Sequence, residues 1–118
     1  MAKFTFVSIT NSSNTEIIYL SQSFEDVLGF SIGNWLGKAP IDLFHPEDRE
    51  GIVIITETCV KLQKLATLVY TRILSASGYQ ILEICISHCY DILVCSNRLL
   101  REEDLPGIFG MFHTIFYY

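Results

Sequence analysis

Cysteine and histidine residues in the second half of the chain could in principle hold a metal ion. Cys85, His88, Cys89 and Cys95 lie close together in the sequence, and thiolate sulfur with imidazole nitrogen is the usual donor set of a zinc site. Residues 79–90, however, predict an extended strand. Along a strand, Cys85 and Cys89 stand about 13 Å apart at ~3.3 Å per residue, and His88 and Cys89 point to opposite faces. The sequence therefore predicts no metal site here.

The other residues with reactive side chains have structural explanations. Cys59 lies on the apolar side of an expected helix, where a lone cysteine is ordinarily a core residue. Glu47 and Asp48 are adjacent carboxylates, which the solvated first turn of a helix explains. His45, just before that helix, suits a capping or exposed position. The sequence contains no nucleophile elbow or phosphate loop, and we predict that the chain is not an enzyme.

Composition narrows the class of protein. The 118 residues suit one domain. Half of them are hydrophobic and the mean hydropathy is +0.36, which predicts a large core or an apolar surface that meets a partner or ligand. A net charge of −5 without a basic stripe argues against direct nucleic-acid binding. No apolar run reaches the ~18 residues of a membrane helix. The four cysteines, without a secretory signal, predict reduced thiols and an intracellular location, in the cytoplasm or nucleus.

Alternation and turn residues predict the elements of the first half. Residues 3–9 and 17–20 form two strands around a polar turn. Ser21 or Ser23 caps a short helix, and Gly29 ends it in the left-handed conformation.

Two further helices follow. Residues 31–37 predict a second short helix, with Trp35 and Leu36 turned inward. Pro46 and the acids after it predict a helix over residues 46–64, because the first helical position does not use its N–H.

The second half of the chain is strand-like. Residues 67–74, 79–90 and 92–95 predict three strands separated by turns. Two strands, several helices and three strands in that order predict an α+β fold, with one five-stranded antiparallel sheet and the helices on one face.

The outer face of this sheet is expected to be covered. Ile81, Glu83 and Cys85 share that face, which is neither clearly polar nor clearly apolar, whereas a half-solvated sheet alternates more cleanly. We expect residues 1–100 to form the domain, and residues 101–118 to form an apolar C-terminal extension that packs on the sheet or on a partner.

The extension is rich in aromatic residues and would promote aggregation if it were free. It is a dimerisation or docking segment, an element that seals the domain's own sheet, or a truncated or artificial chain end. The predicted partner interface consists of Ile81, Cys85, Phe109, Phe112, Ile115 and Phe116.

Two stretches resemble the PAS domain family. Residues 17–30, Ile-Ile-Tyr-Leu-Ser-Gln-Ser-Phe-Glu-Asp-Val-Leu-Gly-Phe, resemble its second strand and first helix. Trp-Leu-Gly-Lys at 35–38, followed by Asp-Leu-Phe-His-Pro-Glu-Asp-Arg at 42–49, is the most diagnostic run. Residues 90–98 are similar to PAS domains of fungal regulatory proteins, including white-collar-like ones. Residues 31–34 depart from the family's usual acid-rich turn, and the chain after Asn97 no longer resembles it.

The resemblance implies a modular role without choosing it. PAS domains sense small molecules, light or redox state, or hold regulatory proteins together as dimers. The light-sensing branch carries a cysteine in a Gly-x-Asn-Cys-Arg-Phe-Leu-Gln run, which residues 36–44 lack. Haem-binding members often place a histidine on the long helix, and residues 46–64 contain none. We therefore predict no cofactor; non-covalent flavin, near Asn97 and Gln80, and haem are the weaker alternatives.

Our first hypothesis is a PAS signalling module in a signal-transduction or transcription-linked protein. It would form a homo- or heterodimer with a protein partner through the outer sheet face and the tail. The alternative is a small-molecule sensor that holds an apolar or aromatic ligand between helices and sheet. Such a cavity would be lined by side chains that can equally be plain core: Phe6, Leu20, Trp35, Phe44, Ile55, Cys59 and Tyr70.

Overall fold

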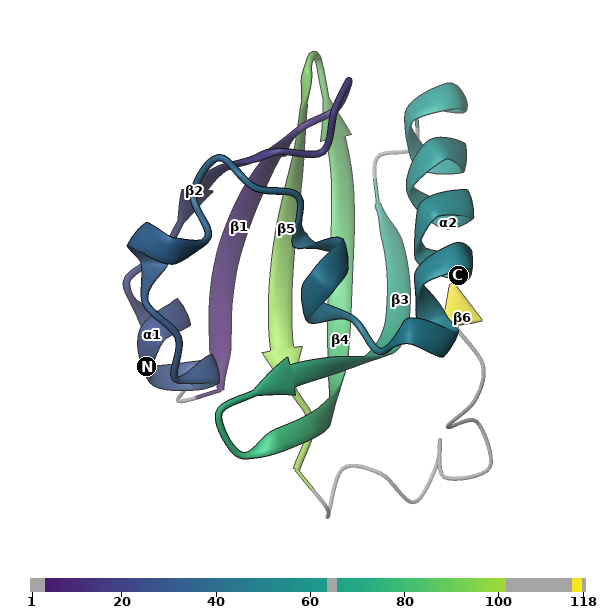
Figure 1. The fold of residues 1–118 in the computed structure, drawn as a ribbon. Helices are drawn as coiled ribbons and strands as arrows, with labels where there is room; N and C mark the ends of the chain where they lie inside the picture. The colour runs from purple at the N-terminus through teal and green to yellow at the C-terminus, as the bar shows by residue number, and fades with distance from the viewer. Residues whose placement is uncertain (1–3, 64–65, 102–115, 118) are drawn as a thin grey trace.

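A single antiparallel sheet organises the protein (Figure 1). The computed structural model describes residues 4–63, 66–101 and 116–117. The strands are β1 (Thr5–Asn11), β2 (Ile17–Leu20), β3 (Thr67–Ser75), β4 (Gly78–Cys89), β5 (Ile92–Leu99) and β6 (Phe116–Tyr117). They lie in the order β2-β1-β5-β4-β3-β6, and every neighbouring pair is antiparallel.

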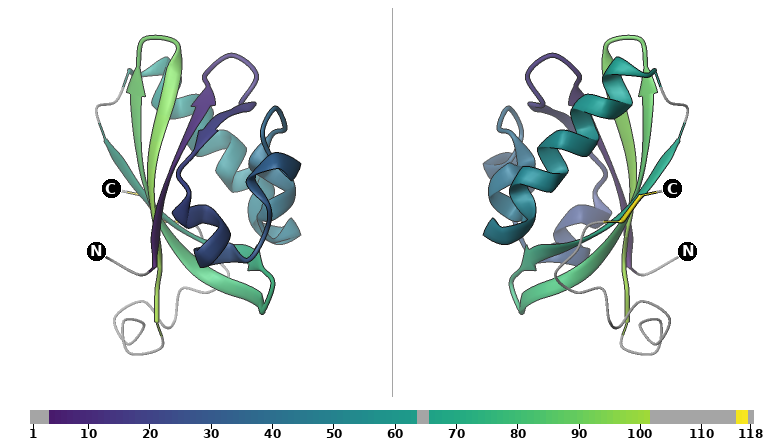
Figure 2. Two further views of the ribbon diagram at one scale, coloured as in Figure 1. Left: turned by 90° about the vertical axis from the view of Figure 1, so that its left-hand side faces the viewer. Right: turned by 90° about the vertical axis from the view of Figure 1, so that its right-hand side faces the viewer.

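Helical segments cover one face of the sheet, as the side views in Figure 2 show. They are α1 (Ser23–Leu28), α2 (Arg49–Lys61) and the 3₁₀ turns η1 (Ile32–Asn34), η2 (Pro40–Leu43) and η3 (Pro46–Asp48). This confirms the predicted α+β fold and its five main strands; β6 is a short sixth strand at the edge.

The hydrophobic core lies between the sheet and these helices. In β3, burial alternates without interruption from Thr67 to Ser75, and in β4 the buried residues are Leu82, Ile84 and Ile86. This period of two places one face of each strand against the helices.

The long helix follows its predicted start but ends earlier. Pro46 begins a 3₁₀ turn that continues into α2, and α2 ends at Lys61. The buried stripe consists of Ile52, Ile55 and Cys59. Leu62, expected to extend that stripe, is 59% exposed because it lies beyond the last helical turn.

Two predictions about individual side chains were wrong. Leu36 is 44% exposed instead of turned inward, because the predicted second helix is only a three-residue 3₁₀ turn and ends before it. Asp48 is buried instead of solvated, since it forms an ion pair with Arg72 of β3.

Both edges of the sheet have backbone partners. At β2, the amide of Ile17 donates to the Lys38 carbonyl, and the amide of Gly37 donates to the Ile17 carbonyl. At β3, the amide of His45 donates to the Arg72 carbonyl, and β6 pairs with the same strand. Within the described ranges, therefore, neither edge strand is left without backbone hydrogen bonds from a neighbouring segment.

Among the described residues, no helix has the length and apolar character needed to cross a membrane.

Candidate ligand cavity

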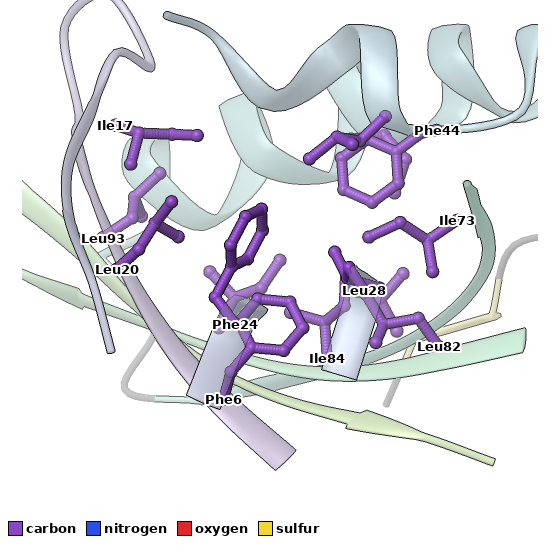
Figure 3. Close-up of a cluster of buried hydrophobic side chains, with 14 of the residues drawn as sticks. Phe6, Ile17, Leu20, Phe24, Leu28, Phe44, Ile73, Leu82, Ile84 and Leu93 are labelled. Carbon is purple, nitrogen blue, oxygen red and sulfur yellow. The ribbon is translucent and has the colours of Figure 1, made fainter. Parts of the chain in front are cut away.

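The layer between sheet and helices encloses a cavity of about 540 Å³. Its floor is the inner face of β1, β4 and β5, and its other walls come from β2, α1, η2 and α2. Figure 3 shows the side chains that converge there, with Leu20 and Leu93 on one side and Phe44 and Ile73 on the other. Phe6 and Phe24 meet edge to face, with ring centroids 5.3 Å apart.

Most of the lining is apolar. The hydrophobic lining residues are Phe6, Ile17, Leu20, Phe24, Ala39, Pro40, Ile41, Leu43, Phe44, Ile52, Val53, Val60, Ile73, Leu82, Ile84, Ile86 and Leu93. A lining of this kind favours an apolar or aromatic occupant, whose burial removes apolar surface from water.

The cavity opens between the β1–β2 turn and α2. The lining residues there include the exposed side chains of Ser13, Asn14, Glu57 and Lys61. The turn is held by a hydrogen bond from the Ser13 amide to Asn11 Oδ1, 2.9 Å. The mouth is thus polar, whereas the interior is mainly apolar.

A polar patch interrupts the apolar floor where β1 meets β5. We call Ser8, Thr10, Cys95 and Asn97 the polar floor; all four line the cavity. They lie together because Ser8 pairs with Cys95, while Thr10 and Asn97 occupy the flanking inward positions. The sequence contained a signal for this patch, since Ser8 and Thr10 share the alternation phase of the buried Phe6.

The thiol of Cys95 is neutral at physiological pH. Burial raises its pKa to about 12, and a hydrogen bond with the Ser8 hydroxyl opposes that rise only in part. A thiolate is the nucleophilic form of cysteine, so Cys95 acts here as a small, weakly polar wall residue.

The expected lining residues occupy three kinds of position. Phe6, Leu20 and Phe44 line the cavity. Ile55 and Cys59 are buried but do not line it, and the Cys59 thiol donates to Thr67 Oγ1 at 3.2 Å.

The remaining two lie away from the cavity. Trp35 packs on the margin of the core and is only partly buried. Tyr70 is on the outer face of the sheet, where its hydroxyl donates to Glu83 at 2.7 Å. It points outward because its neighbours Val69 and Thr71 are the buried, inward residues of β3.

The two amides considered for a flavin are also separated. Asn97 belongs to the polar floor. Gln80 does not line the cavity, and its amide donates to Ser75 Oγ at 2.7 Å near the β3–β4 turn.

The cysteines and His88 do not form a cluster. Cys85 pairs with Ser96 on the outer face, whereas Cys95 pairs with Ile86 on the inner face. In the part of the chain that the structure describes, no three His, Cys, Asp or Glu residues are grouped to hold a metal.

The predicted interface is described only in part. Ile81 and Cys85 are half-buried on the outer sheet face. Phe116 lies in β6, where its backbone pairs with Tyr70. Phe109, Phe112 and Ile115 lie outside the described residues.

The family model described as the PAS fold matches residues 5–115. The chain therefore belongs to the PAS family, a class of signalling and sensor modules rather than of enzymes. The match runs past Asn97, where the resemblance had been expected to end.

Solved PAS domains have the same fold. The PAS domain of the Cronobacter turicensis quorum-sensing receptor RpfR, in complex with BDSF, is 15% identical with a TM-score of 0.75, covering 86% of this chain and 97% of that chain. The same domain in complex with C12:0 is 14% identical with a TM-score of 0.74 and the same coverage. Drosophila melanogaster Cycle PAS-B with bound ethylene glycol is 16% identical with a TM-score of 0.70, covering 80% of this chain and 99% of that chain. No curated protein matches the sequence.

Proposed function

We propose that this PAS domain is a sensor that binds a small, mainly apolar or aromatic molecule in its cavity. The observation that carries the proposal is the cavity of about 540 Å³ behind the sheet. Ligand pockets typically measure ~300–1,000 Å³ and combine an apolar lining with a few placed polar groups. The lining described above has both features.

A cavity of this size differs from an ordinary core. Protein interiors are close-packed, and few of their voids exceed a water molecule. The sequence favoured a plain core for these side chains, so the cavity changes the order of our two hypotheses. The solved domains of RpfR and Cycle were determined with small molecules bound, which supports the sensor proposal without identifying a ligand for this chain.

The experiment compares one substitution on the two faces of the sheet. Cys95→Phe fills the cavity from its floor, and Cys85→Phe makes the same change on the outer face. With the neutral fluorescent probe 1-aminoanthracene, we expect Cys95→Phe to weaken binding about tenfold or more, because one lost ring contact surface of this kind is worth at least ~1.4 kcal/mol.

Cys85→Phe should leave the affinity for the probe unchanged. Circular dichroism of both variants verifies that they are folded. Equal probe affinity in the wild type and in folded Cys95→Phe would place the probe outside the cavity and remove the support for a sensor.

Protein association through the outer sheet face is our second candidate. Val7 is exposed on this face, and half-buried apolar residues surround it on neighbouring strands: Ile9, Leu68, Ile81, Cys85 and Val94. Such a face suits a homo- or heterodimer, and it does not compete with the cavity because the sheet separates the two.

Three narrower predictions also stay open to test. They are a role linked to transcription, a relationship to fungal white-collar-like regulators and an intracellular location in the cytoplasm or nucleus. The last rests on the four cysteines, all of which are free thiols.

A further inference from the structure

Two buried polar side chains of the polar floor have unused hydrogen-bonding capacity. Asn97 is 4% exposed and Thr10 is 5% exposed, and both line the cavity. Buried polar atoms in native proteins nearly always have a partner. Their partners within the chain therefore show what a ligand has to supply.

The amide of Asn97 is oriented by its surroundings. Its Nδ2 lies 3.3 Å from the Phe6 carbonyl, 3.1 Å from Ser8 Oγ and 3.2 Å from the Cys95 carbonyl. Because carbonyl oxygens can only accept hydrogen bonds, the nitrogen must be the atom on that side. Oδ1 is thus the amide acceptor left over, and no group in the described ranges donates to it.

Thr10 adds a second group to the same floor. Its hydroxyl forms no hydrogen bond with any residue in the described part of the chain, although the side chain is buried on the inner face. Thr10 and Asn97 flank the Ser8–Cys95 pair, so one small group could lie between them.

Charge is confined to the mouth of the cavity. The charged residues among the described lining are Glu57 and Lys61, both exposed on α2. The floor itself offers no cation, so a carboxylate buried there would be an unpaired charge. The raised pKa of Cys95 shows the same penalty for an anion.

We propose that the ligand is uncharged and presents a hydrogen-bond donor, a hydroxyl or amide N–H, to Asn97 Oδ1 and Thr10, while its apolar body contacts the surrounding hydrophobic lining. This inference rests on the proposed function, because it names the chemical class that the same cavity binds. It assigns the binding end of the ligand to the floor and leaves the mouth for its other end.

Three probes of equal chain length test the proposal: 1-decanol, its methyl ether and decanoate. The ether keeps the oxygen and loses the donor, and decanoate replaces the neutral donor with a charge. Dissociation constants are measured by ¹⁵N–¹H NMR titration of the full chain. We expect decanol to bind about tenfold more tightly than the ether or decanoate, since one buried hydrogen bond is at stake.

Two floor variants and one control locate the effect. Thr10→Val preserves shape and removes only the hydroxyl, and Asn97→Leu removes the acceptor. Either change should reduce the preference for decanol over the ether toward unity. Ser96→Ala, next to Asn97 but exposed on the other face, should retain the wild-type preference. If Asn97→Leu does not fold, because its amide also holds the two strands together, Thr10→Val decides.

Equal binding of decanol and the ether, tightest binding of decanoate, or an unchanged preference in folded Thr10→Val and Asn97→Leu would each overturn the proposal. If 1-aminoanthracene binds in the cavity and none of the three chains does, this inference fails while the proposed sensor function stands. If neither the dye nor any chain binds, both fail.

Discussion

The ion pair between Asp48 and Arg72 is the strongest polar interaction between the start of α2 and the sheet. Arg72 Nη2 lies 2.7 Å from Asp48 Oδ1, and Arg72 Nε lies 3.0 Å from Oδ2. Oδ2 also accepts from the Arg72 amide at 3.0 Å and from Thr71 Oγ1 at 3.2 Å. With four donors around it and 2% exposure, the carboxylate is buried but fully hydrogen-bonded.

We predict that Asp48→Asn lowers the free energy of unfolding by about 3 kcal/mol, because it leaves Arg72 partly buried without its counter-charge. Glu47→Gln is the matched control: Glu47 also contacts Arg72, at 3.3 Å, but its side chain is exposed. The control should change stability by less than ~1 kcal/mol. Urea denaturation measures both, and equal losses in the two variants would contradict the prediction.

The same pair makes stability depend on acid pH. Burial raises the pKa of Asp48, but the hydrogen bonds and charge of Arg72 outweigh it, so the pKa lies below its ordinary value. The contribution is therefore complete above ~3.9, the ordinary pKa of aspartate, and is lost as the pH falls through the lowered value. Unfolding measured below pH ~4 should show this loss in the wild type and lack it in Asp48→Asn; parallel curves would argue against it.

At the scale of elements, the end of α1 is joined to the β3–β4 turn. Gly29 ends the helix at φ 80°, with its amide donating to the Glu25 carbonyl at 2.9 Å. The Ala76 amide donates to the Leu28 carbonyl at 2.8 Å. This close approach requires glycine twice over, since a Cβ at position 29 would lie 2.7 Å from that of Ala76.

We predict that Gly29→Ala destabilises the protein more than Gly37→Ala. Both glycines have a positive φ, near +80°, so both variants carry the left-handed strain of ~1–2 kcal/mol. Only position 29 adds a steric overlap, worth a further ~1–3 kcal/mol, because nothing lies within 4 Å of a Cβ at position 37. Thermal unfolding compares them, and an equal or larger loss for Gly37→Ala would reject the packing argument.

At the scale of the whole molecule, the sheet separates two surfaces with different proposed uses. The inner surface faces the cavity, and the outer surface carries the apolar residues of the second candidate function. Cys85 lies between Leu68 and Ser96 on the outer surface, so a charge there tests association without entering the cavity.

We predict that the wild type associates at high concentration and that Cys85→Asp weakens this association, because a buried interfacial charge lacks a partner. Ser77→Asp, in the exposed β3–β4 turn, is the control. Size-exclusion chromatography with light scattering measures the mass. A wild type that stays monomeric speaks against the outer face as an interface, whatever the variants do. Phe112→Asp tests the tail in the same way.

The sequence alone determined the order and type of the elements, because those depend on local spacing. Alternation predicted the strands, Gly29 the end of α1, and Pro46 the start of the long helical segment. The buried stripe of Ile52, Ile55 and Cys59 followed from helical periodicity.

Only the tertiary structure decided what lies between those elements. A cavity depends on how far the helices stand from the sheet, and spacing along the chain does not encode that distance. Phe44 and Cys59 are both buried, yet only Phe44 lines the space. Asp48 looked solvated because its partner, Arg72, lies on a strand far along the chain. Asn97 became a candidate binding residue only when its amide nitrogen was seen to be engaged by neighbouring strands, which leaves its oxygen for a ligand.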